Sequence, residues 1–203
     1  MTTKPTKPRE MRIEVPVLAR VEGEGALDIQ VRDGEIEHLR LRIFEPPRLF
    51  EQFLVGHHYS EIPDLVARIC GICPVAYQMS GAAAVERLFG CETGPWVQRM
   101  RRLFYCGEWI QSHALHIHLL AAPDFLGFDS APAMAARHGD EVRRGLQLQG
   151  LGNRIIRLFG ARSVHPVGAR IGGFWKAPAP DQVAALAADV KRAIPAAEDL
   201  VRW

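Results

Sequence analysis

The chain has 203 residues, 48% of them hydrophobic and 24% charged, which is enough for one or two domains with a buried core. Its formal net charge of +2, without a basic stripe that carries interleaved aromatic residues, gives no reason to expect nucleic-acid binding. No stretch approaches the length of an uninterrupted apolar membrane span, and four cysteines without a framework of regular pairs fit a reducing, cytoplasmic compartment.

The first predicted elements are strands. Apolar and polar residues alternate over residues 27–32 and again over residues 38–43. Between these runs lies Asp33-Gly34, a pair typical of the tight turn that joins two antiparallel strands. Residues 12–20 are expected to add a third strand, so the start of the chain is predicted to form a small antiparallel sheet.

From Arg48 onward the apolar residues recur at intervals of three and four, which is the period of helices. The last predicted helix has Asp181 as its N-cap and a break at Pro195. Residues 163–180 are rich in glycine and proline and are predicted to be an irregular connection. The predicted helices span residues 48–55, 74–89, 95–121, 132–159 and 182–201.

Together these elements predict an α+β fold, in which a small N-terminal antiparallel β-sheet is followed by a mainly helical bundle. The predicted parts are a disordered tail at residues 1–11, a β-sheet subdomain at 12–44 and a helical domain at 45–203. The tail is basic and proline-rich, and no apolar run follows it that could form a signal peptide.

The main candidate for chemistry is the pair Cys70 and Cys73, within Arg-Ile-Cys-Gly-Ile-Cys-Pro-Val-Ala-Tyr. A Cys-x-x-Cys turn can bring two sulfurs onto one metal ion, and Gly71 is expected to let the backbone turn without a Cβ clash. Pro74 suits the first turn of a helix, which would place Cys73 at the positive end, where a thiolate is favoured. The spacing alone leaves open half of a zinc site, a redox dithiol, part of an iron–sulfur site or an inert core pair.

The other metal-ligating residue types form no comparable motif. Cys91 and Cys106 are not spaced as a second ligand pair and are expected to be small buried hydrophobes. His113 and His116 lie one helical turn apart, and His118 follows. Such histidines can bind zinc, but without an adjacent acid or cysteine motif they are expected to be hydrogen-bonded helix or interface residues.

Several segments around the cysteine pair resemble a known family. The segments are Ala19–Gly25, Phe44–Glu51, Ala67–Met79, Tyr105–His116, Ala122–Gly127 and His165–Phe174. They resemble the N-terminal half of the large subunit of nickel–iron hydrogenases, most closely its cytoplasmic, NAD(P)-linked or sulfur-reducing branch. The likeness covers nearly the whole chain and implies part of the hydrogenase large-subunit fold.

The resemblance implies a nickel–iron centre at which dihydrogen is split heterolytically. Cys70 is then a terminal nickel ligand and Cys73 bridges nickel and iron, because soft thiolates suit both metals. In the family the iron also carries cyanide and carbon monoxide. An Asp-Pro-Cys-x-x-Cys motif completes the nickel coordination there, and nothing like it follows Cys106. The chain is therefore expected to be a truncated or partial large subunit, incomplete at the C-terminus and inactive alone.

Two acids receive roles from the same resemblance. Glu22, in Arg-Val-Glu-Gly, is the proposed proton relay, a role that requires a pKa raised by burial. Glu51, nineteen positions before Cys70, corresponds to the family's magnesium ligand, and Glu45 is a nearby rival. Judged without the resemblance, Glu22 and Glu51 are both ordinary solvated acids.

Three further residues flank the proposed centre. Tyr77 stands where much of the family has histidine, and it is expected either to donate its phenol hydrogen to the bridging sulfur or to be a core aromatic. Arg68 and Arg48 are expected to hydrogen-bond near the diatomic ligands or to orient the loop.

The implied partners follow from what the chain lacks. It has no four-cysteine set for an iron–sulfur cluster, so an iron–sulfur small subunit is expected across a large apolar interface, to which Trp96, Trp109 and Trp175 could contribute. NAD(P)-binding diaphorase subunits and maturation factors are also implied. Two alternatives stay open: a hydrogenase-like, non-catalytic subunit of a respiratory electron-transfer complex, whose relatives generally lack the cysteine pair, or a zinc-binding structural module.

Overall fold

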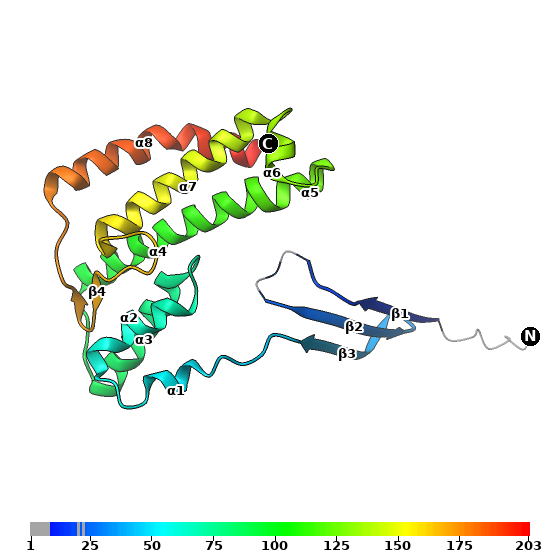
Figure 1. Ribbon diagram of the computed structural model, residues 1–203, viewed down its shortest axis with the longest axis horizontal. Coiled ribbons are helices and arrows are strands. Elements are labelled where there is room, and N and C mark those ends of the chain that lie inside the picture. The colour runs from blue at the N-terminus through cyan, green and yellow to red at the C-terminus, as the bar shows by residue number, and fades with distance from the viewer. Residues whose placement is uncertain (1–8, 20, 22) are drawn as a thin grey trace, which may run out of the picture. The chain divides into compact units, whose positions relative to one another are not determined.

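The computed structural model describes residues 9–19, 21 and 23–203. Contacts divide the chain into two units, Met1–Arg48 and Leu49–Trp203 (Figure 1). The first unit holds a three-stranded antiparallel sheet and the second is mainly helical. The predicted α+β class, with a small N-terminal sheet followed by helices, is therefore confirmed.

The sheet places β2 (Gly25–Arg32) between β1 (Glu10–Val15) and β3 (Glu35–Ile43). Asp33 and Gly34 join β2 to β3, and both have positive φ, of 52° and 91°. This is the conformation that Asp-Gly favours in a two-residue hairpin, so the predicted hairpin is confirmed. The third strand is also found, but it starts and ends earlier than the predicted range of 12–20.

The helical unit begins with short elements and continues into long helices that alternate with short ones. Its elements are α1 (Phe50–Leu54), the 3₁₀ turn η1 (Tyr59–Glu61), α2 (Ile62–Val66), the 3₁₀ turn η2 (Ala67–Ile69), α3 (Pro74–Phe89), α4 (Pro95–Leu115), the π-helical turn η3 (His116–Ala121), α5 (Ala122–Leu126), α6 (Ala131–Ala135), α7 (Gly139–Gly160), the strands β4 (Ala169–Arg170) and β5 (Gly173–Phe174), and α8 (Pro180–Arg202).

Most predicted helices are found, but the N-cap and the break that the sequence predicted for α8 are wrong. Its N-cap is Ala179, and Pro180 takes the first helical position, where its missing N–H does no harm. Asp181 lies instead in the first turn, where its charge complements the helix dipole. The helix also continues past Pro195 without a break. No residue of α8 is buried, so water can satisfy the backbone group that the proline leaves unpaired.

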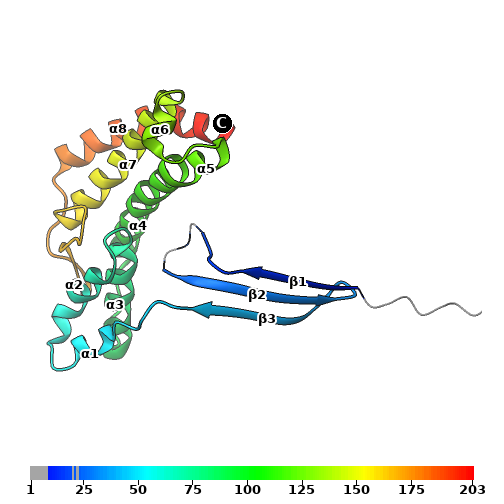
Figure 2. The ribbon, with the colours of Figure 1, turned by 45° about the vertical axis from the view of Figure 1, so that its right-hand side comes forward.

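The core of the helical unit lies where α4 crosses α7. Figures 1 and 2 show α7 between α4 and α8; on the other side of α4 lies α3, and α2 packs against α3. Glycines allow α4 and α7 to approach closely: a Cβ at Gly107 would lie 2.8 Å from Ile155, and one at Gly152 would lie 2.6 Å from the Gly107 oxygen. The buried apolar cluster consists of Val75, Met79, Phe104, Leu151, Ile155, Ile156, Phe159 and Ala169.

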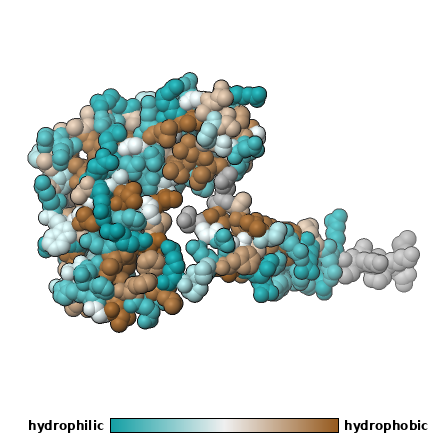
Figure 3. All heavy atoms as spheres, viewed as in Figure 1, coloured by the Kyte–Doolittle hydropathy of each residue, from teal (hydrophilic) through white to brown (hydrophobic). Residues whose placement is uncertain are grey.

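Apolar side chains also remain on the surface of each unit, as the space-filling view shows (Figure 3). In the sheet unit Leu39, Leu41 and Ile43 are exposed although they alternate with polar residues. In the helical unit Leu88 and Phe125 are among the most exposed. Within the part of the chain that the structure describes, no helix has both the length and the apolar character that crossing a membrane requires.

Candidate metal centre

The Cys70–Cys73 turn links η2 to α3. Cys70 follows η2 in an extended conformation, and Cys73 is the N-cap of α3, with Pro74 at the first helical position. The backbone N–H of Cys73 donates to Sγ of Cys70 at 3.2 Å, which closes the turn. Both side chains are half-buried, and neither forms a disulfide. The helix predicted from Pro74 therefore places the second cysteine at its positive end, as expected.

Gly71 does not have the role that the sequence predicted for it. Its φ is not positive, and a Cβ built on it would meet nothing within 4 Å. The turn closes through the Cys73 N–H without a left-handed residue, so a Cβ at position 71 would cause no clash in this conformation. The predicted steric need for glycine is wrong.

A buried acid from α4 contacts the start of α3. Glu108 is 3% exposed, and its two carboxylate oxygens accept the backbone N–H groups of Val75 at 2.6 Å and Ala76 at 3.1 Å. These N–H groups belong to the first turn of α3 and have no acceptor within the helix. Glu108 was not among the residues predicted from the sequence, although it lies one turn after Phe104 on the apolar face of α4, which is a signal for a buried acid.

A second side chain of α4 holds the turn from the other side of Cys73. Nε2 of Gln111, which is 7% exposed, donates to the backbone oxygen of Ile72 at 2.8 Å. Glu108 and Gln111 lie one helical turn apart, so they face the same side of α4. Together they bind backbone groups on both sides of Cys73, at Ile72 before it and at Val75 and Ala76 after it.

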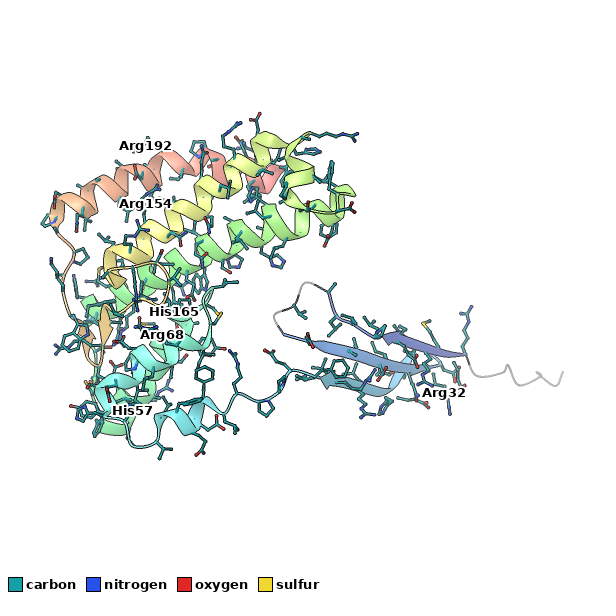
Figure 4. The ribbon with its side chains drawn as sticks, viewed as in Figure 1. Arg32, His57, Arg68, Arg154, His165 and Arg192 are labelled. Carbon is teal, nitrogen blue, oxygen red and sulfur yellow. The ribbon has the colours of Figure 1, made fainter. Side chains whose placement is uncertain are left out.

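The segment after α7 supports the approach to Cys70. Nδ1 of His165 lies 2.8 Å from the backbone oxygen of Ala67 in η2. Ala67 is the residue before Arg68, and Figure 4 shows His165 close to Arg68, in agreement with this contact. Nε2 of the buried Gln78 donates to the Pro166 oxygen at 2.8 Å and to Asp64 at 3.1 Å. The cysteine turn is thus tied to residues nearly 100 positions away in the sequence.

Burial dominates the electrostatics near the turn. It raises the pKa of Glu108 to about 7 from an ordinary 4.5, although the hydrogen bonds from Val75 and Ala76 act to lower it. Burial also raises the pKa of Asp64, against the hydrogen bond from Gln78. At the far end of α3, burial acts to raise the pKa of Glu86, but hydrogen bonds from Arg101 and Gly172 outweigh it and hold that pKa below its ordinary value.

The other predicted site residues are spread over the two units. Glu22 lies outside the described residues. The rival acid Glu45 lies beside Gly23: a Cβ added to Gly23 would be 2.5 Å from the Glu45 carboxylate. Arg48 is the last residue of the first unit and is exposed.

In the helical unit Glu51 is an exposed residue in the first turn of α1. Arg68 is exposed two positions before Cys70, and Tyr77 is 37% exposed in α3. Across residues 9–19, 21 and 23–203, no three histidine, cysteine, aspartate or glutamate side chains are close enough together to hold a metal ion. Cys70, Cys73 and Glu51 therefore do not form such a group.

The remaining cysteines and the histidines have ordinary surroundings. Cys91 is exposed in the loop after α3, so the prediction that it is buried is wrong, while Cys106 is half-buried. Nδ1 of His113 lies 2.6 Å from the Trp109 oxygen, and Nδ1 of His118 lies 3.0 Å from the Ala114 oxygen. These are contacts within the histidines' own helical segment, as predicted, and they do not favour a zinc module.

Comparisons with known proteins identify the class. Residues 48–147 match the nickel-dependent hydrogenase family. The chain is 39% identical over 191 residues to the alpha subunit of sulfhydrogenase 2 of Pyrococcus furiosus, and the match covers 94% of this chain and 46% of that protein. It is 36% identical over 170 residues to a subunit of an F420-non-reducing hydrogenase of Methanocaldococcus jannaschii, covering 80% of this chain and 40% of that one.

A solved structure agrees with these relatives. The crystal structure of an NAD⁺-reducing [NiFe]-hydrogenase in the H₂-reduced state superposes with a TM-score of 0.78 at 34% identity, covering 96% of this chain and 44% of that one. The chain therefore belongs to the nickel-dependent hydrogenases and is homologous to their large subunits, which confirms the resemblance. It spans about half the length of the relatives that it matches.

Membership in this family implies a nickel–iron centre, and the residues of the cysteine turn fit it in part. Cys70 and Cys73 offer two soft sulfur ligands on one turn at a helix N-terminus, held by buried side chains on both sides. Two sulfurs supply part of the ligand set of such a centre and not the whole of it.

Proposed function

We propose that the protein to which this chain belongs is the large-subunit component of a nickel–iron hydrogenase, which cleaves dihydrogen heterolytically and reversibly. The observation that carries this proposal is the half-buried Cys70–Cys73 turn, which Glu108 and Gln111 hold by hydrogen bonds. The chain that contains it is 39% identical to the alpha subunit of a sulfhydrogenase. The cysteine pair also favours this function over a non-catalytic respiratory relative, which would generally lack it.

In this proposal Cys70 is a terminal nickel ligand and Cys73 bridges nickel and iron, with cyanide and carbon monoxide on the iron. The centre, when bound, supplies the redox and Lewis-acid chemistry on which dihydrogen is split. The protein's contribution is to hold the two sulfurs at a fixed separation. The Cys73 N–H bond to Cys70 and the contacts from α4 support that role.

Other side chains of this chain are assigned to proton transfer, to a magnesium ion and to hydrogen bonds near the centre. We assign Glu22 as the proton relay and Glu51 as a magnesium ligand, because carboxylates suit both tasks. Tyr77, four positions after Cys73, donates its phenol hydrogen towards the cysteine turn. Arg68 and Arg48 orient the loop or hydrogen-bond near the diatomic ligands.

The electrons leave through partner proteins. We propose an iron–sulfur small subunit, NAD(P)-binding diaphorase subunits and NAD(P) or sulfur as final acceptor, in the cytoplasm, with assembly by maturation factors. The support is that one matched relative is named a sulfhydrogenase and another an NAD⁺-reducing hydrogenase. Trp96, Trp109 and Trp175, all of them exposed, are available for a subunit interface.

Single substitutions in the cell-assembled enzyme test the ligand assignment. Cys70→Ser and Cys73→Ser are expected to abolish hydrogen-dependent dye reduction, because a hydroxyl is a poor ligand for these soft metals. Cys91→Ser, at an exposed cysteine, is the matched control and should retain activity. Full activity of Cys70→Ser would show that this sulfur is not a ligand.

A further inference from the structure

Helix α3 is capped by a side chain from another helix. An N-cap side chain ordinarily accepts the N–H of the second or third helical residue. In α3 the N-cap is Cys73, and its side chain makes no capping hydrogen bond. The two N–H groups, from Val75 and Ala76, donate instead to the two carboxylate oxygens of Glu108 on α4.

From this arrangement we propose that Glu108 is a positioning residue of the metal centre: it occupies the amides that the Cys73 sulfur would otherwise cap, and so orients that sulfur for a metal. The inference rests on the proposed function, in which Cys73 is a ligand. An N-cap side chain is the acceptor that such first-turn amides ordinarily find, so without Glu108 the Val75 and Ala76 amides would be open to the Cys73 sulfur. A sulfur that accepted these amide hydrogens would be engaged by the helix and less available to a metal.

Two features make Glu108 an effective brace. Its carboxylate uses both oxygens on neighbouring amides, which fixes the group in one orientation. Its backbone lies next to Gly107, where α4 and α7 approach so closely that a Cβ would collide with Ile155. The helix that carries Glu108 therefore has little freedom to shift, and this rigidity passes to the cysteine turn.

Gln111 completes the brace on the other side. It binds the Ile72 oxygen, one residue before Cys73, while Glu108 binds the amides that follow Pro74. The backbone on either side of Cys73 is thus held by hydrogen bonds to side chains. Both side chains, Glu108 and Gln111, come from one turn of α4. Such support around a ligand is what holds a metal site in a productive geometry.

The test compares Glu108→Ala and Glu108→Gln with Glu86→Gln, in the full chain with Cys91→Ser and Cys106→Ala as background. Glu86 is a suitable control because it is also a buried glutamate that accepts a backbone N–H, but at the far end of α3. Two quantities are measured: amide hydrogen exchange at Val75 and Ala76, and the thiolate-to-nickel charge-transfer absorption as Ni²⁺ alone is added to the reduced protein.

In Glu108→Ala the protection of both amides should fall about tenfold, as expected for the loss of a hydrogen bond, and half-saturation with Ni²⁺ should need about tenfold more metal. Glu108→Gln keeps one acceptor oxygen, so it should protect one amide and restore part of the nickel affinity. Glu86→Gln weakens the buried ion pair with Arg101, so it controls for lost stability: it should leave the nickel titration unchanged. If Glu108→Ala does not fold, Glu108→Gln supplies the same comparison.

Three results separate the possibilities. Loss of amide protection with unchanged nickel binding would make Glu108 a helix cap only and overturn the inference. An equal loss of nickel binding in Glu86→Gln would attribute the effect to general destabilisation and also overturn it. No charge-transfer band in the background protein would count against Cys70 and Cys73 as nickel ligands, which concerns the proposed function, while the exchange measurement would still test the cap.

Discussion

Glu108 should make the stability of the protein depend on pH, and Glu108→Gln should remove that dependence. Burial raises the pKa of Glu108 to about 7, whereas the unfolded chain should release this proton near the ordinary value of 4.5. Between these values the folded protein holds a proton that the unfolded chain has lost. The free energy of unfolding should therefore fall as the pH rises from about 4.5 to about 7 and stay level above that range.

The size of the effect follows from the pKa difference. One pKa unit corresponds to about 1.4 kcal/mol, so the shift of Glu108 amounts to about 3 kcal/mol across the interval. Burial also shifts two other groups: it raises the pKa of Asp64 and lowers that of His118. Because both remain in Glu108→Gln, the difference between the parent and this variant isolates Glu108.

The measurement is urea-induced unfolding of the full chain and of Glu108→Gln at several pH values from about 5 to about 8. The difference in unfolding free energy should shift by about 2.5 kcal/mol in favour of the glutamine variant over this interval. A difference that stays constant with pH would mean that Glu108 titrates normally in the folded protein, and would refute the burial argument.

Three substitutions test the packing and the turn. Gly152→Ala should lower the free energy of unfolding by about 1–3 kcal/mol or more in a urea titration, because its Cβ would collide with the backbone of Gln111. Arg101→Leu should lower it by about 3–5 kcal/mol, seen as a clear drop in Tm, since it leaves the buried Glu86 carboxylate without its ion-pair partner. Gly71→Ala should change it by less than about 0.5 kcal/mol, because a Cβ there meets nothing within 4 Å; a large loss would contradict the geometry of the turn.

The local signals in the sequence predicted the elements around the centre well. Helix α3 begins at Pro74, in the first helical position, and ends before Gly90, which has a left-handed conformation. Both residues are local signals, so the limits of α3 could be predicted from the sequence alone. The Cys70–Cys73 turn was recognisable for the same reason, since its spacing and the following proline are local. Proline was less reliable in α8, where an exposed helix continues through Pro195.

The contacts that support the turn could not be predicted in this way. Glu108 lies 33 positions from Val75, and His165 lies 98 positions from Ala67. Only the packing of α3 against α4, and the path of the chain after α7, bring these groups together. Glu108 was not among the predicted site residues. An acid on the apolar face of α4 is a local signal for a buried partner, but the sequence does not say which backbone groups donate to it.

The metal content of the protein isolated from cells in its assembled form is the most direct test of a nickel–iron centre at the Cys70–Cys73 turn. Nickel and iron should be present together, and both should be lost in Cys70→Ser while Cys91→Ser retains them. Zinc in place of nickel and iron, or an active preparation with neither metal, would contradict the assignment of the Cys70–Cys73 turn to a nickel–iron centre.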